Sequence, residues 1–136
     1  MNGYKQTASP NVMLKPKHIS DQQILDWILS GAIRMTHLDT SNPQLIFHGR
    51  HVRAELVEQS GKRRLSGTKR YSFSFQYKGM RRRIVRAKLV WMVVHKSLVP
   101  GDCLVHHEDK NCLNDHPDNL HATDYETHME IHYGKF

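Results

Sequence analysis

Histidine and asparagine side chains recur at short intervals near the end of this 136-residue chain. His106 and His107 are adjacent, Asn119 follows His107 by 12 residues, and His128 and His132 stand four residues apart after it. Imidazoles can hold a divalent cation, a further imidazole can take a proton from water, and an amide can fix the geometry between them. These are the parts that a nuclease built around one metal ion needs, so the array is a candidate site for metal-dependent hydrolysis of a phosphodiester bond.

Three short elements are expected to position these side chains. Residues 103–107 and 119–122 predict two short strands joined by a polar loop, and Thr123 is placed to cap a terminal helix. On that helix His128 and His132 lie one turn apart, so both imidazoles can share one cation. A lone HxxxH pattern is usually surface decoration, and only the conjunction with the other residues favours a site.

Upstream, the pattern predicts a hairpin followed by a helix. Aromatic residues occupy every second position from 71 to 77, which predicts a strand with one aromatic face. We interpret this face as part of the core rather than as a platform for stacking bases. Lys78-Gly79 predicts the turn, residues 80–85 the returning strand, and residues 86–96 a packed helix.

Charge is divided unevenly along the chain, whose net charge is +7. Residues 50–88 hold 13 Lys and Arg against two acids, whereas residues 100–136 hold two Lys against eight acids. A basic segment of this density is typical of a phosphate-backbone footprint, although charge runs are often only solvated surface. In the returning strand, Arg81 and Arg83 should share one face and Arg82 the other. The expected DNA-binding residues are Arg81, Arg82, Arg83, Arg86 and Lys88.

The first half of the chain gives weaker signals. Residues 1–18 predict an irregular arm, Ser20 and Gly31 predict the start and end of a helix, and residues 44–48 and 54–57 could be short strands. The fold expected is a small single α+β domain. Residues 1–69 would form an arm, a helix and short strands of unassigned role, and residues 70–136 the nuclease unit.

Composition narrows the class of protein. The longest apolar run, residues 89–94, is far shorter than a membrane span, and no apolar signal core opens the chain. We therefore expect an intracellular protein that does not enter a membrane. Cys103 and Cys112 could form a disulfide, but the simpler interpretation is that they are ordinary thiols. The sequence contains no CxxC motif, so no second, structural zinc site is predicted.

The segment from about residue 70 to residue 136 resembles the phage and mobile-element branch of the HNH (His-Asn-His) endonuclease family. In that family a basic hairpin and a helix precede a two-stranded ribbon and a helix that grip one metal ion, the ββα-metal motif. Two positions depart from the family pattern: Ala87 replaces a histidine and Lys110 replaces a glycine. The matching segments are Lys88-Leu89-Val90-Trp91, Pro100-Gly101, Val105-His106-His107-Glu108-Asp109, Asn111, Asn114-Asp115, Asp118-Asn119-Leu120 and His128-Met129-Glu130-Ile131-His132.

The resemblance implies a role for each matching residue. His107 would be the general base that activates water, and His106 and His128 would be metal ligands. His132 would be a third ligand or a phosphate contact, and Asn119 would orient the base and brace the loop. The implied cofactor is one divalent metal ion (Zn, Ni, Mn or Mg), and the implied partner is DNA, in the host cytoplasm if the protein is phage-encoded.

Two other hypotheses stay open at this stage. The chain could be a non-catalytic DNA-binding module that keeps the metal fold for structure, or a phage-packaging accessory protein. The N-terminal half, residues 1–69, could also contact a protein partner. An intact His107 favours the enzyme, because a purely structural metal site needs no general base.

Overall fold

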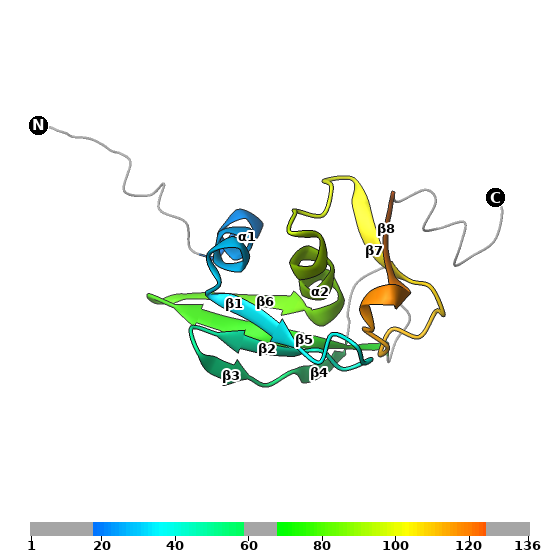
Figure 1. Ribbon diagram of the computed structural model, residues 1–136, viewed down its shortest axis with the longest axis horizontal. Helices are drawn as coiled ribbons and strands as arrows, with labels where there is room; N and C mark the ends of the chain where they lie inside the picture. The colour runs from blue at the N-terminus through cyan, green and yellow to red at the C-terminus, as the bar shows by residue number, and fades with distance from the viewer. Residues whose placement is uncertain (1–17, 59–67, 125–136) are drawn as a thin grey trace, which may run out of the picture.

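The computed structural model describes residues 18–58 and 68–124 of the chain. In this part, the two α-helices lie on the same side of the β1–β6 strands, and the β7–β8 hairpin stands beside α2 (Figure 1). This is a small mixed α/β domain with three antiparallel sheets, ordered β1-β2-β3, β4-β5-β6 and β7-β8. The elements are α1 (Asp21–Ser30), β1 (Ile33–Thr36), β2 (Gln44–Phe47), β3 (Arg50–Val52), β4 (Glu55–Glu58), β5 (Lys69–Tyr77), β6 (Met80–Val85), α2 (Arg86–His95), β7 (Cys103–His107), the 3-10 helix η2 (Pro117–Asn119) and β8 (Leu120–Asp124).

Helix α1 begins and ends where the sequence predicts. The hydroxyl of Ser20 accepts a hydrogen bond from the backbone N–H of Gln23, at 3.1 Å. At the other end Gly31 adopts a left-handed conformation, with φ of 88°, and its N–H bonds to the carbonyl of Ile28. A hydroxyl cap satisfies an otherwise unpaired N–H, and glycine accepts the left-handed conformation without a side-chain clash.

The hairpin predicted from residue 71 onward is confirmed. Strands β5 and β6 pair across Lys78-Gly79, where φ is 50° and 81°. His48-Gly49 joins β2 to β3 in the same way, with φ of 49° and 80°. Two consecutive positive φ values match the right-handed twist of the flanking strands, and glycine at the second position adopts its positive φ without a steric penalty. Helix α2 follows β6 directly, as expected.

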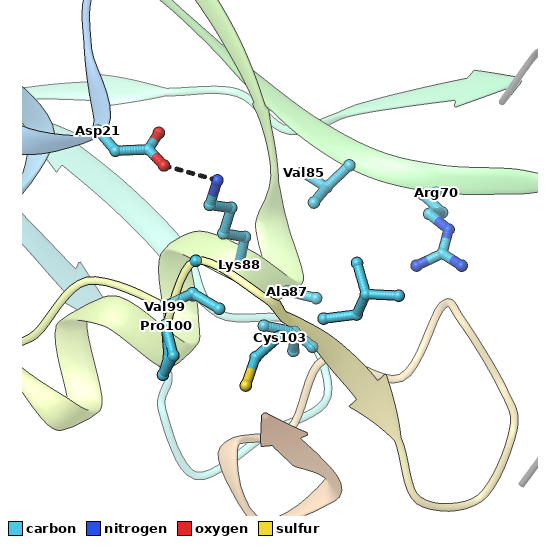
Figure 2. A pocket seen from close by; sticks show the side chains of 11 residues that line it. Asp21, Arg70, Val85, Ala87, Lys88, Val99, Pro100 and Cys103 are labelled. Atoms are coloured by element: carbon cyan, nitrogen blue, oxygen red, sulfur yellow. Dashed lines mark hydrogen bonds and ion pairs between the residues drawn. The ribbon is translucent and has the colours of Figure 1, made fainter. Parts of the chain in front are cut away.

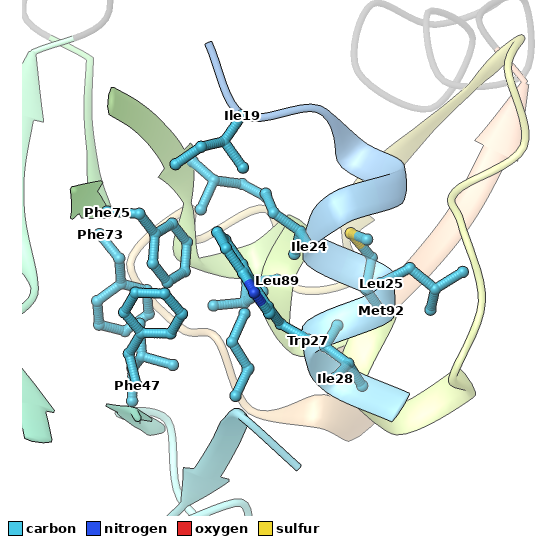
Figure 3. Packing of buried hydrophobic residues seen from close by; sticks show 13 residues of the cluster. Ile19, Ile24, Leu25, Trp27, Ile28, Phe47, Phe73, Phe75, Leu89 and Met92 are labelled. Carbon is cyan, nitrogen blue, oxygen red and sulfur yellow. The ribbon is translucent and has the colours of Figure 1, made fainter. Parts of the chain in front are cut away.

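The aromatic face of β5 points into the core, as predicted. Phe73 and Phe75 are each 1 % exposed. In Figure 3 the ring of Trp27, from α1, stands between its helix and the phenylalanines. The centroid of Trp27 lies 4.8 Å from that of Phe47 and 5.1 Å from that of Tyr77. Edge-to-face contacts of this kind add to the burial of large apolar rings.

One core therefore draws on both sides of the division expected at residue 69. Trp27 and Phe47 from the first half belong to the same buried cluster as Phe75 and Leu89 from the second. Strand β4 also pairs with β5, so residues before and after position 69 share one sheet. Position 69 therefore separates segments of different expected role, but the residues on its two sides share one hydrophobic core.

The β7–β8 hairpin supplies the two strands expected around the polar loop, but β8 runs two residues further than predicted. Thr123 pairs with Leu104, and Asp124 pairs with Cys103. The prediction that Thr123 caps a helix is wrong, because the backbone at Thr123 is part of the ladder. Residues 125–136, where the rest of the terminal helix was expected, lie outside the described residues. Neither α1 nor α2 is long and apolar enough to cross a membrane.

Candidate active site

The two adjacent histidines of β7 lie on opposite faces of the hairpin. His107 pairs with Leu120 and His106 pairs with His121, and paired residues of an antiparallel ladder share a face. Leu120 packs with Val90 of α2, so the His107 face is turned toward that helix. Both His106 and His107 are only 4 % exposed. The alternation of the strand thus gives each histidine a different environment.

His107 is held by a buried acid in the loop that follows it. Its Nε2 lies 2.8 Å from Oδ1 of Asp115, and the other carboxylate oxygen of Asp115 lies 2.7 Å from Nε of Arg86. Asp115 is 1 % exposed and Arg86 is 3 % exposed. The carboxylate of Asp115 therefore links the imidazole of His107 to the guanidinium of Arg86, and all three groups are shielded from solvent.

This contact decides which nitrogen of His107 can act as a base. An ionised carboxylate only accepts hydrogen bonds, and the other oxygen of Asp115 faces the guanidinium of Arg86, which only donates them. We therefore assign the proton of the neutral imidazole to Nε2, which donates to Asp115. The lone pair is then on Nδ1. Fixing the tautomer in this way is what a general base needs.

Arg86 also ties the loop to the N-terminal half of the chain. Its Nη2 donates to the carbonyl of Ser41 at 3.3 Å and to the side-chain oxygen of Asn42 at 3.2 Å. The backbone N–H of Asp115 donates to the same Ser41 carbonyl at 3.0 Å. The guanidinium carbon lies 4.2 Å from the ring centroid of Tyr71. The planar guanidinium thus satisfies partners in several directions, which a lysine could not do.

Asn119 braces the loop, as the family resemblance implies. Its side-chain oxygen accepts from the backbone N–H of Asp109, and its amide donates to Asp109 Oδ1 and to the carbonyl of Asn114. The other implied role, orienting His107, belongs to Asp115 instead. Asn119 directs both atoms of its amide across the loop, and Asp115 makes the hydrogen bond to the ring of His107.

Asp109 is the centre of this loop network. Its carboxylate accepts hydrogen bonds from the side chain of Asn114, the backbone N–H of Asn111 and the side chain of Asn119. These donors, with Asn114 first, lower the pKa of Asp109 from its usual value. Each bond is stronger to the ionised carboxylate than to the acid, so the loop favours the charged form.

The expected metal centre is only partly inside the described residues. His106 lies on the hairpin face away from α2, opposite His121, whose Nε2 is 2.9 Å from Glu108 Oε1. Within residues 18–58 and 68–124, no three His, Cys, Asp or Glu side chains are grouped so that they could hold a metal ion. His128 and His132 lie outside that part. Three imidazoles, His106 with these two, would be a donor set suited to a divalent transition ion.

Lys88 and Arg82, two of the expected DNA-binding residues, are engaged by one acid. Asp21, the first residue of α1, lies 2.6 Å from Arg82 Nη2 and 2.8 Å from Lys88 Nζ. Burial alone would raise the pKa of Asp21, but the hydrogen bonds and charges of Lys88 and Arg82 outweigh it, and the pKa is lowered. Arg82 also donates to the carbonyl of Ile19. Both cations are therefore part of the packing of α1 on β6 and α2.

Lys88 also borders a hollow of about 290 Å³ beside β7. Figure 2 shows Asp21 and Lys88 joined on one side of it and Arg70 on the other. Because Asp21 already balances Lys88, the hollow offers mixed charge rather than a purely positive surface. Its lining consists of Asp21, Arg70, Val85, Ala87, Lys88, Val99, Pro100, Gly101, Cys103, Leu104 and Val105.

The other three expected DNA-binding residues differ in solvent exposure. Arg81 and Arg83 are exposed and share one face of β6, as predicted from the alternation. Arg86 is buried and paired with Asp115, which does not fit a phosphate contact at the surface. We therefore withdraw Arg86 from the DNA-binding set. Its charge serves the buried loop contact instead.

Comparison with protein-family models, with curated proteins and with solved structures finds no match to this chain. The sequence alone did not identify Asp115 as the partner of His107, or Arg86 as the partner of Asp115. One signal was present, because Arg86 opens a helix whose next residues are largely apolar. A charge at the border of a buried helix often has a buried partner, but 29 positions separate the two residues here.

Proposed function

We propose that this protein is a metal-dependent DNA endonuclease of the HNH type that hydrolyses phosphodiester bonds. The observation that supports the proposal most is the buried hydrogen bond between His107 and Asp115, 2.8 Å long, in the strand that also carries His106. A histidine oriented by a carboxylate is the arrangement expected of a general base. The neighbouring residue, His106, lies on the opposite face of the strand and belongs to the proposed set of metal ligands.

In this mechanism, Nδ1 of His107 takes a proton from the water that attacks phosphorus. Asp115 holds the ring by Nε2 and stabilises the positive charge that the imidazole acquires. Arg86 keeps Asp115 in place, through the 2.7 Å contact and its own bonds to Ser41 and Asn42. Asp115 and Arg86 are thus positioning residues, because they act only through His107.

The divalent cation would be held by His106 and His128, with His132 as a third ligand or a phosphate contact. When bound, such an ion stabilises the negative charge that develops on the phosphate and on the leaving 3′ oxygen. Imidazole ligands suit Zn²⁺ and Ni²⁺ better than Mn²⁺ or Mg²⁺, although the ion bound most tightly need not give the fastest turnover.

The test is cleavage of supercoiled plasmid by the full chain with Mg²⁺, Mn²⁺, Ni²⁺ or Zn²⁺, each with and without EDTA. His107→Ala should lower the cleavage rate about 10²- to 10⁴-fold, the usual cost of losing a general base. His51→Ala, which removes an exposed histidine of β3, is the matched control and should cut normally. Circular dichroism and duplex binding establish that each variant is folded. Normal cleavage by folded His107→Ala would remove His107 from this role.

One observation favours a second candidate, a non-catalytic DNA-binding or phage-packaging accessory module. His107 is only 4 % exposed, and a base must reach water and phosphate. If the wild-type chain binds duplex DNA but cuts plasmid with none of the four metals, this alternative holds. The His107–Asp115–Arg86 contact would then serve to hold the loop in place.

A further inference from the structure

The face of the β5–β6 hairpin opposite the core carries polar side chains that are exposed within the part of the chain that the structure describes. Arg83 pairs with Ser74, and Arg81 pairs with Gln76, so the four side chains lie together on the outer face of the hairpin. All four are exposed. The inner face of the same two strands carries the buried Phe73, Phe75 and Ile84. Strand β4 pairs with β5 only at residues 69–72, so beyond Ser72 the sheet continues, among the described residues, as the two strands β5 and β6, with a single backbone bridge from His18 beside Arg81. This part of the hairpin has a packed side and an exposed, positively charged side.

The two arginines of this face are available for a partner. In the part of the chain that the structure describes, neither Arg81 nor Arg83 forms an ion pair, whereas Arg82 between them is bound to Asp21. Residues two apart on a strand are separated by about 6.6 Å, so the side chains of Arg81 and Arg83 leave the same face of β6 as neighbours. Their cross-strand neighbours, Ser74 and Gln76, are uncharged hydrogen-bonding groups.

We propose that this outer face, carried by Ser74, Gln76, Arg81 and Arg83, binds duplex DNA in the major groove and reads base edges there. The inference rests on the proposed function only in taking DNA as the partner. The major groove is wide enough for a two-stranded ribbon. Arginine can bond both acceptors of guanine, and glutamine can bond both the donor and the acceptor of adenine.

Charge and composition favour DNA over a protein partner at this face. The four side chains contain two positive charges, no acid and no large apolar group. A protein interface usually has an apolar centre, whereas a DNA interface is polar and positively charged. The groove of the duplex supplies the complementary negative potential. The contact would also give the nuclease a preference for certain sequences, which phosphate contacts alone do not provide.

The first test compares two double variants in duplex binding by fluorescence anisotropy. Arg81→Ala with Arg83→Ala should weaken binding about 10-fold or more, because one bidentate contact to a base is worth about 1–3 kcal/mol, or roughly 5- to 150-fold. Arg34→Ala with Arg53→Ala removes the same charge from exposed positions outside β5 and β6 and should change affinity far less. Equal losses in the two double variants would overturn the inference, since only net charge would then matter.

The second test asks which groove is occupied. The tightest duplex recovered from a random pool is treated with dimethyl sulfate, which methylates N7 of guanine in the major groove. Wild-type protein should protect at least one guanine, and the double variant of Arg81 and Arg83 should not. Gln76→Ala should select a different base at one position of the site. Unprotected guanines, or no base preference by the wild type, would overturn the inference, while plasmid cleavage by the wild type would still support the nuclease.

Discussion

Nε of Arg86 lies 2.7 Å from Oδ2 of Asp115, and both side chains are almost completely buried. Arg86 is the first residue of α2, and Asp115 belongs to the loop between β7 and β8. The ion pair therefore fixes the loop on the helix, and through Asp115 it also fixes the ring of His107. A small hairpin, which would be marginal alone, gains a defined position from a charge that the preceding helix supplies.

The stability of the domain should depend on this pair as a unit. Asp115→Ala leaves the buried guanidinium of Arg86 without its carboxylate and should destabilise the fold by about 3–5 kcal/mol, as for other broken buried pairs. Arg86→Met should cost a similar amount. The double variant should cost clearly less than the sum of the two, because it leaves no uncompensated charge. Urea unfolding at pH 7 measures all three, and additive losses would show that the two residues act independently.

Asp115→Asn should separate positioning from folding. The amide keeps the size of the carboxylate, but it cannot accept from both His107 and Arg86 through two oxygens. If His107 is the base, the maximal cleavage rate should fall about 100-fold or more while the half-saturating DNA concentration changes little. Asp118→Asn, at a side chain that is 94 % exposed, is the control. A change confined to DNA affinity would argue against a positioning role for Asp115.

The loop network around Asp109 should weaken in acid. The folded-state pKa of Asp109 is lowered, so its contribution is present above the unfolded pKa, near pH 4, and is lost as the pH falls through the folded value. Asp109→Asn should therefore lower stability at pH 7 and reduce the loss of stability below about pH 4. Thermal unfolding from pH 7 to pH 3 measures this. Parallel pH curves for the wild type and the variant would contradict it.

Gly79 should contribute to the stability of the domain through its backbone conformation, and not because a larger side chain would lack room there. Its φ is 81°, and a Cβ added there would meet nothing within 4 Å. Gly79→Ala should therefore destabilise the domain by about 1–2 kcal/mol, the cost of a left-handed conformation for an L-residue. Gly101→Ala is the matched control, because that position is equally open and has no positive φ. Equal effects of the two substitutions on urea unfolding would rule out the conformational explanation.

Metal binding should depend on His106. Isothermal titration of the full chain should give one site, tighter for Zn²⁺ or Ni²⁺ than for Mg²⁺. His106→Ala should weaken it at least about 10-fold, whereas His121→Ala should have a smaller effect, because that imidazole already contacts Glu108 at 2.9 Å. Unchanged affinity in His106→Ala would remove this residue from the proposed ligand set.

Local patterns in the sequence were sufficient for several elements. Ser20 and Gly31 predicted both ends of α1, because a hydroxyl cap and a left-handed glycine act within a few residues of the chain. The alternation from residue 71 and the turn at Lys78-Gly79 predicted β5 and β6 for the same reason. Strands β1 and β3 were missed, because each is fixed by its pairing with β2, and the sequence of the segment itself does not record that pairing.

The sequence by itself determined which side chains could do chemistry and their order along the chain. Only the tertiary structure decided their partners. His107 contacts Asp115 rather than Asn119, and Arg86 is buried beneath the loop. Arg82 is bound to Asp21, whereas Arg81 and Arg83 form no ion pair with the other described residues. The physical reason is that the Arg86–Asp115 and Arg82–Asp21 ion pairs join residues 29 and 61 positions apart, and that Asp115 is held against His107 by the distant Arg86. Such contacts form only when sheets and helices pack, and no local pattern records them.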